Sequence, residues 1–180
     1  DVDHPDPLVL LSFSTVPEQR SAESLQRALD ALSSLPVRVV ATTGGIVEVD
    51  ELDAPANAYV VEVADHDALL AQASLVVGHG GHGTTMRTLR AGLPLVGMPA
   101  KGTDQASNLH LVEQLGAGRF LPPDSDRDLI AATVTEVLRD PAYRAAAQRL
   151  SLDFVGRDGA ALAADSLDEV LAARTAGAAT

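Results

Sequence analysis

Short apolar runs alternate with amphipathic helix patterns over the first two thirds of this 180-residue chain, and this alternation most constrains its fold. Strands that are separated by helices pair in parallel, and the helices then cover the sheet. The pattern therefore predicts an α/β fold with a Rossmann-like parallel sheet and helices on both faces. The expected strands are 8–13, 37–41, 59–63, 75–78, 94–98 and 118–121, and the expected helices are 22–32, 67–73, 84–91 and 104–115.

The last third of the chain has helix patterns at 128–139, 143–152 and 160–173 with no strand between them. These extra C-terminal helices are more than one sheet layer needs, so we expect one of them to pack against a neighbour. Residues 1–7 are polar with two prolines, which indicates an interdomain linker. We expect one domain over residues 8–174 and a disordered, Ala-rich tail over 175–180.

The charge balance limits the partners of the chain. It carries 25 acidic and 13 basic residues, for a formal net charge of -12. Nucleic acids and anionic membranes require a basic face, so neither is an expected partner. The sequence has no cysteine and no apolar run near the ~18 residues of a membrane span. We therefore expect a cytoplasmic protein that holds any phosphate through local groups.

The segment from Gly78 to Thr85 is a glycine-rich loop, in which two histidines and two threonines stand among four glycines. The loop follows an expected strand and opens an expected helix. Glycines let a ligand approach the backbone, and the first N–H groups of a helix attract phosphate. A tight turn without a ligand is the simpler interpretation. No Gly-Lys-Ser/Thr sequence follows, so the loop is not a Walker loop. It is also not the first strand-to-helix turn of the chain, so it is not the dinucleotide-binding fingerprint.

Three motifs in this order resemble the donor-site signature of UDP-glycosyltransferase-like enzymes of GT-B fold. They are His79-x-Gly81-x-Gly83-Thr84, Pro99-x-x-x-x-Asp104-Gln105-x-x-Asn108 and Gly116-x-Gly118. The chain looks most similar to bacterial enzymes of the natural-product and macrolide type. The resemblance covers only the C-terminal half of a GT-B fold. It implies that the half with the acceptor site and the catalytic base lies outside this chain.

The resemblance implies roles for the loop residues in holding the donor diphosphate. These residues are His79, Gly81, Gly83, Thr84 and Thr85, together with Ser14 and Thr15 after the first strand. A histidine satisfied by the backbone and an ordinary polar turn are the alternatives for His79 and for Ser14–Thr15. The pair His79 and His82 has no third ligand at a suitable spacing, so no metal site is expected.

The same resemblance places the nucleotide base at Val63, Ala64 and His66. Relatives usually have Trp and Pro where Val63 and Asp65 stand, so aromatic stacking is lost and the identity of the base is open. Arg87 stands where many relatives bind the ribose with glutamate. Arginine cannot accept a hydrogen bond, so Arg87 either reaches a phosphate or faces solvent.

Asp104 and Gln105 resemble the residues that bind the sugar hydroxyls of the donor. A carboxylate accepts hydrogen bonds from two neighbouring hydroxyls, and an amide both donates and accepts. The alternative is that Asp104 caps the helix that follows it.

The resemblance implies a hexosyltransferase in the full-length protein. It would move a hexose or deoxyhexose from UDP or TDP to a small-molecule acceptor, with inversion and without a metal or a cofactor. The isolated chain would be inactive. The alternatives are another GT-B enzyme of nucleotide sugars, such as an epimerase or a cell-wall glycosyltransferase, and a non-catalytic binding partner.

Overall fold

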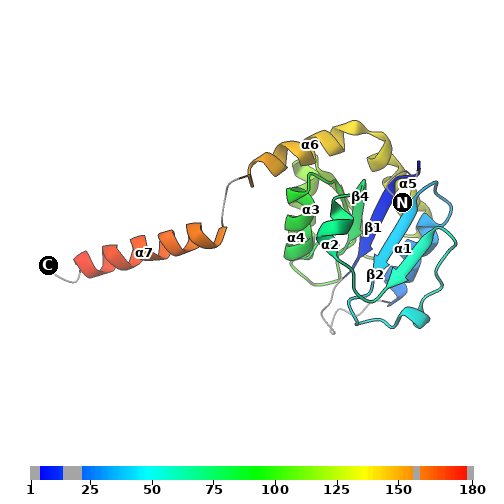
Figure 1. The fold of residues 1–180 in the computed structure, drawn as a ribbon, viewed down its shortest axis with the longest axis horizontal. Helices are drawn as coiled ribbons and strands as arrows, with labels where there is room; N and C mark the ends of the chain where they lie inside the picture. Colours follow the sequence, from blue (N-terminus) through cyan, green and yellow to red (C-terminus); the bar gives the residue numbers. More distant parts are fainter. Residues whose placement is uncertain (1–4, 14–21, 156–158, 178–180) are drawn as a thin grey trace.

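The computed structural model describes residues 5–13, 22–155 and 159–177, with side chains up to residue 171. Its strands form one parallel six-stranded sheet in the order β3-β2-β1-β4-β5-β6 (Figure 1). The strands are β1 (Leu8–Ser12), β2 (Arg38–Thr42), β3 (Ala58–Val61), β4 (Leu75–Gly78), β5 (Leu95–Gly97) and β6 (Gly118–Phe120). The helices are α1 (Ala22–Leu32), the 3-10 helix η2 (Val49–Glu51), α2 (His66–Leu70), α3 (His82–Arg90), α4 (Gln105–Gln114), α5 (Arg127–Arg139), α6 (Pro141–Leu152) and α7 (Gly159–Gly177).

The central strands β1 and β4 are buried at every position because both faces of the sheet are covered. Side chains alternate between the faces along a strand. Val9 and Leu11 of β1 belong to the core between the sheet and helices α1 and α5. Leu10 belongs to a second core, which packs against α2, α3, α4 and α6. The sheet is therefore doubly wound.

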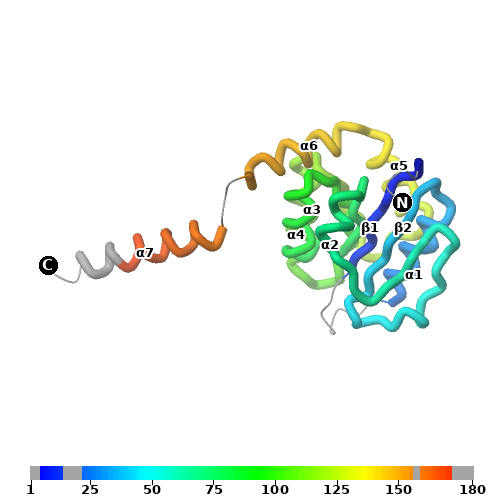
Figure 2. The backbone as a smooth tube through the Cα atoms, viewed as in Figure 1, coloured from blue at the N-terminus to red at the C-terminus, as the bar shows by residue number. Residues whose placement is uncertain are grey.

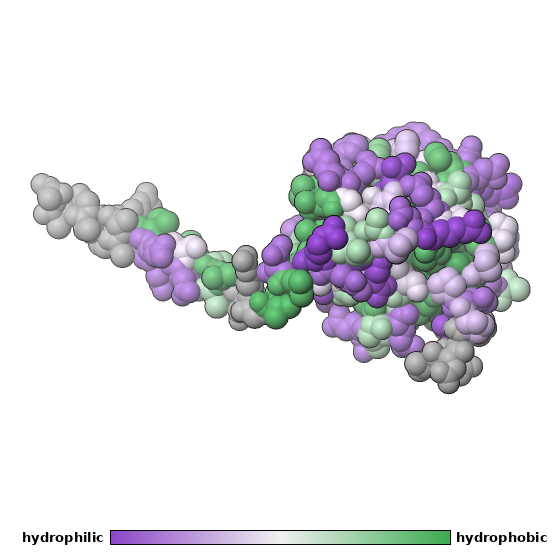
Figure 3. All heavy atoms as spheres, turned by 90° about the horizontal axis from the view of Figure 1, so that it is seen from above, coloured by the Kyte–Doolittle hydropathy of each residue, from purple (hydrophilic) through white to green (hydrophobic). Residues whose placement is uncertain are grey.

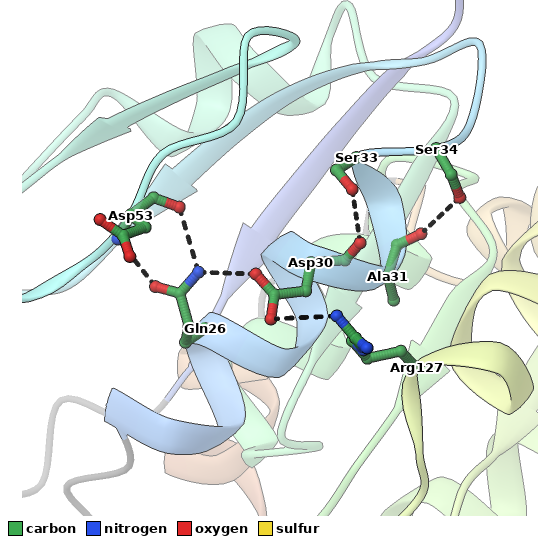
Figure 4. A network of polar contacts seen from close by, with 7 residues as sticks. All are labelled: Gln26, Asp30, Ala31, Ser33, Ser34, Asp53 and Arg127. Carbon is green, nitrogen blue, oxygen red and sulfur yellow. Dashed lines mark hydrogen bonds and ion pairs between the residues drawn. The ribbon is translucent and has the colours of Figure 1, made fainter.

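Polar contacts hold α1 to its neighbours at the edge of the first core (Figure 4). The Gln26 amide donates to Asp30 Oδ1 at 2.8 Å and accepts from the Asp53 N–H at 2.8 Å, so it links α1 to the segment after η2. Asp30 also lies 3.9 Å from a guanidinium nitrogen of Arg127 on α5. These contacts link α1 to the segment after η2 and to α5.

Each helix on the second face begins or ends at a residue suited to that position. Asp65 caps α2 by accepting from the N–H groups of Asp67 and Ala68. Gly92 and Gly116 follow α3 and α4 with φ of 65° and 70°, a conformation that glycine adopts without strain. The predicted helix ends at both glycines are confirmed.

The turn between α5 and α6 lies at the amino ends of the strands, because Pro7, Ser74 and Pro94 line a cavity together with Asp140 and Pro141. Figure 2 shows α6 crossing the body from there toward α7. Helix α7 extends away from the body, and all its described side chains are exposed. Figure 3 shows apolar side chains along this arm, which include Leu162, Leu167, Val170 and Leu171.

The fold class predicted from the sequence is confirmed, and every predicted strand and helix is present with small differences at the ends. Helix η2 was not predicted. Residues 175–177 belong to α7, whereas residues 1–4 and 178–180, which carry most of the predicted linker and tail, lie outside the described residues. Among the described residues, no helix is both long and apolar enough to cross a membrane.

Candidate functional site

The carboxyl ends of β1 and β4 meet at the point where the strand order reverses. Ligands of open α/β sheets bind in the crevice at such a point. Ser12 at the end of β1 pairs with Gly78 at the end of β4. A Cβ on Gly78 would lie 2.6 Å from the Ser12 carbonyl oxygen, so only glycine permits this approach. The glycine-rich loop therefore begins inside the crevice.

The inner side of the loop is fixed against α4. Gly80 has φ of +80°, and a Cβ there would lie 2.4 Å from Leu109 Cγ. Asn108 donates from its side-chain nitrogen to the Gly80 carbonyl oxygen at 3.0 Å. This bond gives Asn108, the last residue of the second motif, a role that the sequence did not reveal: it positions the loop.

The outer side of the loop is open. Gly83 is exposed, and a Cβ there would have no described neighbour within 4 Å. Helix α3 begins with Gly81 at its N-cap and without a side-chain cap. Helix geometry leaves the N–H groups of residues 82–84 without an intrahelical acceptor. An anion at Gly83 would meet these N–H groups together with the positive end of the helix dipole.

His79 lies half-buried beside this opening. Its Nδ1 is buried and has no hydrogen-bond partner among the described residues. A Cβ on Gly81 would lie 2.3 Å from His79 Nε2, so the glycine makes room for the ring. Burial lowers the pKa of His79, and a hydrogen bond with the Ser12 backbone opposes this shift. The ring is therefore neutral at pH 7, and its Nε2 is the ring nitrogen that lies beside the loop at Gly81.

The two threonines of the loop differ in accessibility. Thr84 is half-buried, whereas Thr85 is only 5% exposed and its hydroxyl has no partner among the described residues. Thr84 is thus the more accessible hydroxyl. Ser14 and Thr15, the other predicted diphosphate residues, lie outside the described residues.

The predicted base-binding residues do come together. Val63, Ala64 and His66 line one cavity of about 300 Å³ at the carboxyl ends of β1, β2 and β3, and Arg87 of α3 reaches its wall. We call it the base cavity. Its other lining residues were not predicted, although each lies directly beyond a strand or at its end: Ser12, Phe13, Thr42, Gly44 and Glu62.

A chain of hydrogen bonds orients His66 within the base cavity. The Thr42 hydroxyl lies 3.2 Å from His66 Nε2 and donates to the Ser12 hydroxyl at 3.2 Å. Burial, and secondly the positive charge of Arg87, lower the pKa of His66, while Asp67 and Asp65 raise it. The imidazole is therefore neutral at pH 7 and can both donate and accept hydrogen bonds.

Asp104 and Gln105 follow β5 and face different surroundings. Asp104 is exposed, and it stands at the N-cap of α4 without a side-chain capping bond. Gln105 is 4% exposed, and its Oε1 accepts from the Ala100 N–H at 2.9 Å. Gln105 thus supports the turn before α4, while the carboxylate of Asp104 is accessible.

No group of three or more His, Cys, Asp or Glu side chains that could hold a metal occurs in the described part of the chain. The polar groups that line the loop side of the crevice are backbone N–H groups, the loop hydroxyls and His79.

Comparison with known proteins gives a consistent result. The family described as "Erythromycin biosynthesis protein CIII-like, C-terminal domain" matches residues 26–170. A PGL/p-HBAD biosynthesis glycosyltransferase of Mycobacterium tuberculosis is 35% identical over 143 residues, covering 79% of this chain and 33% of the relative. The 4'-demethylrebeccamycin synthase of Lentzea aerocolonigenes is 33% identical over 171 residues, covering 93% and 39%. This chain therefore spans only about a third of the length of these relatives.

Solved structures show the same relation. The calicheamicin glycosyltransferase CalG4 superposes with a TM-score of 0.82 at 28% identity, covering 94% of this chain and 43% of that one. The spinosyn rhamnosyltransferase SpnG complexed with thymidine diphosphate superposes with a TM-score of 0.77 at 26% identity, covering 92% and 46%. The fold is that of the C-terminal domain of GT-B natural-product glycosyltransferases. The chain belongs to the family of erythromycin biosynthesis protein CIII-like C-terminal domains.

Proposed function

We propose that this chain is the donor-binding domain of a glycosyltransferase that moves a hexose or deoxyhexose from a UDP- or TDP-sugar to a small-molecule acceptor. The observation that carries the proposal is the open glycine loop at the strand-order reversal, with His79 Nε2 beside it at Gly81. The names of the relatives support transfer of a sugar. The SpnG complex supports thymidine diphosphate as the nucleotide.

The described residues suit the three parts of such a donor. The base would enter the base cavity, where His66 and backbone groups near Ala64 offer hydrogen bonds. The diphosphate would lie over Gly81 and Gly83 and receive hydrogen bonds from α3 and His79. Preorganised donors of this kind stabilise the negative charge that develops on a leaving nucleoside diphosphate. The sugar would project toward Asp104 beyond β5.

The chemistry needs a second set of groups from outside this chain. We propose that a base on the missing N-terminal half activates the acceptor hydroxyl, which attacks the anomeric carbon with inversion. The loop N–H groups and His79 would take up the leaving-group charge, so neither a metal nor a cofactor would be required. The exposed apolar residues of α7 would pack on that half in the intact protein.

Calorimetry and a turnover assay on the isolated chain test this proposal. We expect the chain to bind TDP or UDP without a divalent cation and to transfer no sugar to any acceptor. Failure to bind either nucleotide would contradict the donor-binding role. Sugar transfer by the chain alone would contradict the assignment of the base to another domain, and a strict requirement for Mg²⁺ or Mn²⁺ would contradict charge uptake by the loop.

A further inference from the structure

A second and larger cavity, of about 540 Å³, lies on the helical face between α2, α3 and α6. Arg87 and Arg90 of α3 and Arg144 of α6 line it, and we call it the arginine cavity. Its remaining wall consists of Asp67 and small or apolar residues of α2 and α3. It lies beside the base cavity, because Arg87 lines both.

The described residues that line this cavity carry more positive than negative charge. Arg87 and Arg90 are exposed and form no hydrogen bond or ion pair with any described residue. Arg144 is anchored by one guanidinium nitrogen, which lies 3.4 Å from the Ala73 carbonyl oxygen and 3.5 Å from that of Ser74. Three guanidinium groups thus face a single carboxylate, that of Asp67.

This grouping is unusual for a chain of net charge -12 with only 13 basic residues. The dipole of α3 favours bases in its last turn, which accounts for Arg87 and Arg90 individually. It does not account for Arg144, which comes from another helix and brings a third like charge to the same space. A bound anion would remove the repulsion between the three groups.

We propose that the arginine cavity binds a phosphate-bearing anion, at a site distinct from that of the donor nucleotide. Guanidinium groups present paired N–H donors that match the oxygens of a phosphate. The cavity is larger than one phosphate group, so pyrophosphate or a small phosphate ester fits its volume. Because Arg87 lines both cavities, the anion site and the base cavity are adjacent but separate.

Inorganic pyrophosphate is the probe, measured by calorimetry at constant ionic strength on the chain saturated with TDP. Saturation prevents pyrophosphate from reporting on the glycine loop. We expect one equivalent to bind, and Arg90→Ala to weaken it about tenfold, since one charge-assisted contact is lost. Arg149→Ala is the matched control: Arg149 is exposed on α6 and lines neither cavity, so this variant should bind within twofold of the parent.

Amide NMR shifts give the location independently. Pyrophosphate should perturb the amides around Arg90 and Arg144 in the parent chain, and His79→Ala should leave these shifts intact. Equal binding by Arg90→Ala and Arg149→Ala, or shifts confined to residues 80–84, would overturn the proposal. If TDP does not bind at all, the proposed donor-binding function is contradicted. The comparison of Arg90→Ala with Arg149→Ala still tests whether the arginine cavity binds pyrophosphate. AMP and glucose 6-phosphate in place of pyrophosphate then distinguish a phosphate ester from the free ion.

Discussion

Single residues of the crevice differ in what their polar side chains contact. Gln105 and Asn108 both use their amides to hold backbone groups, at Ala100 and Gly80. His79 is held by a hydrogen bond with the Ser12 backbone, and its Nε2 lies beside Gly81. Under the proposed function, this Nε2 meets the donor phosphate.

Replacement of His79 by alanine tests this role. We expect TDP and UDP affinities to fall about tenfold to a hundredfold, since a hydrogen bond to a charged group is worth roughly 1.5–3 kcal/mol. The affinity for the bare nucleoside should change much less, and His82→Ala, at the exposed histidine of the same loop, is the control. Calorimetry with nucleoside and nucleotide measures both. Equal losses for the two ligands would show that His79 shapes the fold or contacts the base.

Substitutions of the neighbours Asp104 and Gln105 should have different effects on ligand affinity and on stability. Asp104→Asn should leave TDP affinity unchanged but reduce the additional affinity contributed by the sugar, by about 1 kcal/mol for each lost hydroxyl contact. Gln105→Ala should instead lower the free energy of unfolding by about 1–3 kcal/mol, because the Ala100 N–H loses its acceptor. Nucleotide and nucleotide-sugar titrations with thermal melts distinguish them. A loss of stability in Asp104→Asn would identify it as a helix cap.

At the scale of elements, the strand-to-helix unit β4–loop–α3 combines a rigid inner side with an open outer side. Gly80 and Gly83 lie three residues apart and serve these opposite needs. The Gly80 position is closed by Leu109 and has φ of +80°, whereas the Gly83 position is empty and helical. The inner side of the loop is therefore fixed by its packing against Leu109, and the N–H groups on its outer side are accessible to a ligand.

Alanine at each of these two glycines should have a different effect. Gly80→Ala should cost about 1–2 kcal/mol of stability for the left-handed conformation and roughly 1–3 kcal/mol more for the collision with Leu109. Gly83→Ala should keep or slightly raise stability, since alanine favours a helix. It should weaken TDP binding, because the added methyl group would occupy the position proposed for the phosphate. Urea unfolding and calorimetry on both variants check this, and equal stability losses would contradict the division.

The β4–loop–α3 unit and its surroundings show how much of the structure could be predicted from the sequence alone. Apolar runs and helical spacing predicted every strand and every α-helix of the described residues, because both faces of a parallel sheet must be covered. The cluster of Val63, Ala64, His66 and Arg87 followed from a resemblance. The partners of Gln105 and Asn108, and the position of Arg87 between two cavities, could not be predicted. They depend on the distances between segments that only folding brings together.

At the scale of the whole molecule, the chain consists of a closed body and an arm. The body buries its own cores on both faces of the sheet. The arm is α7, whose described side chains are exposed and include Leu162, Leu167, Val170 and Leu171 (Figure 3). Exposed apolar groups on one helix indicate a surface that is normally covered. This exposed apolar surface fits the role proposed above, in which the arm packs against another domain.

Truncation after residue 155 tests this division between body and arm. Because α7 buries no described side chain on the body, its removal should leave the melting temperature within about 2 °C and TDP affinity within twofold, given that 1 kcal/mol corresponds to roughly 2–4 °C at this size. Removing the apolar residues should also reduce self-association at high concentration, which sedimentation measures. The matched control is the full chain with Leu167→Glu and Leu171→Glu, which keeps the arm but not its apolar surface, and should show the same reduction. A large fall in melting temperature after truncation would instead show that α7 packs on the body in solution.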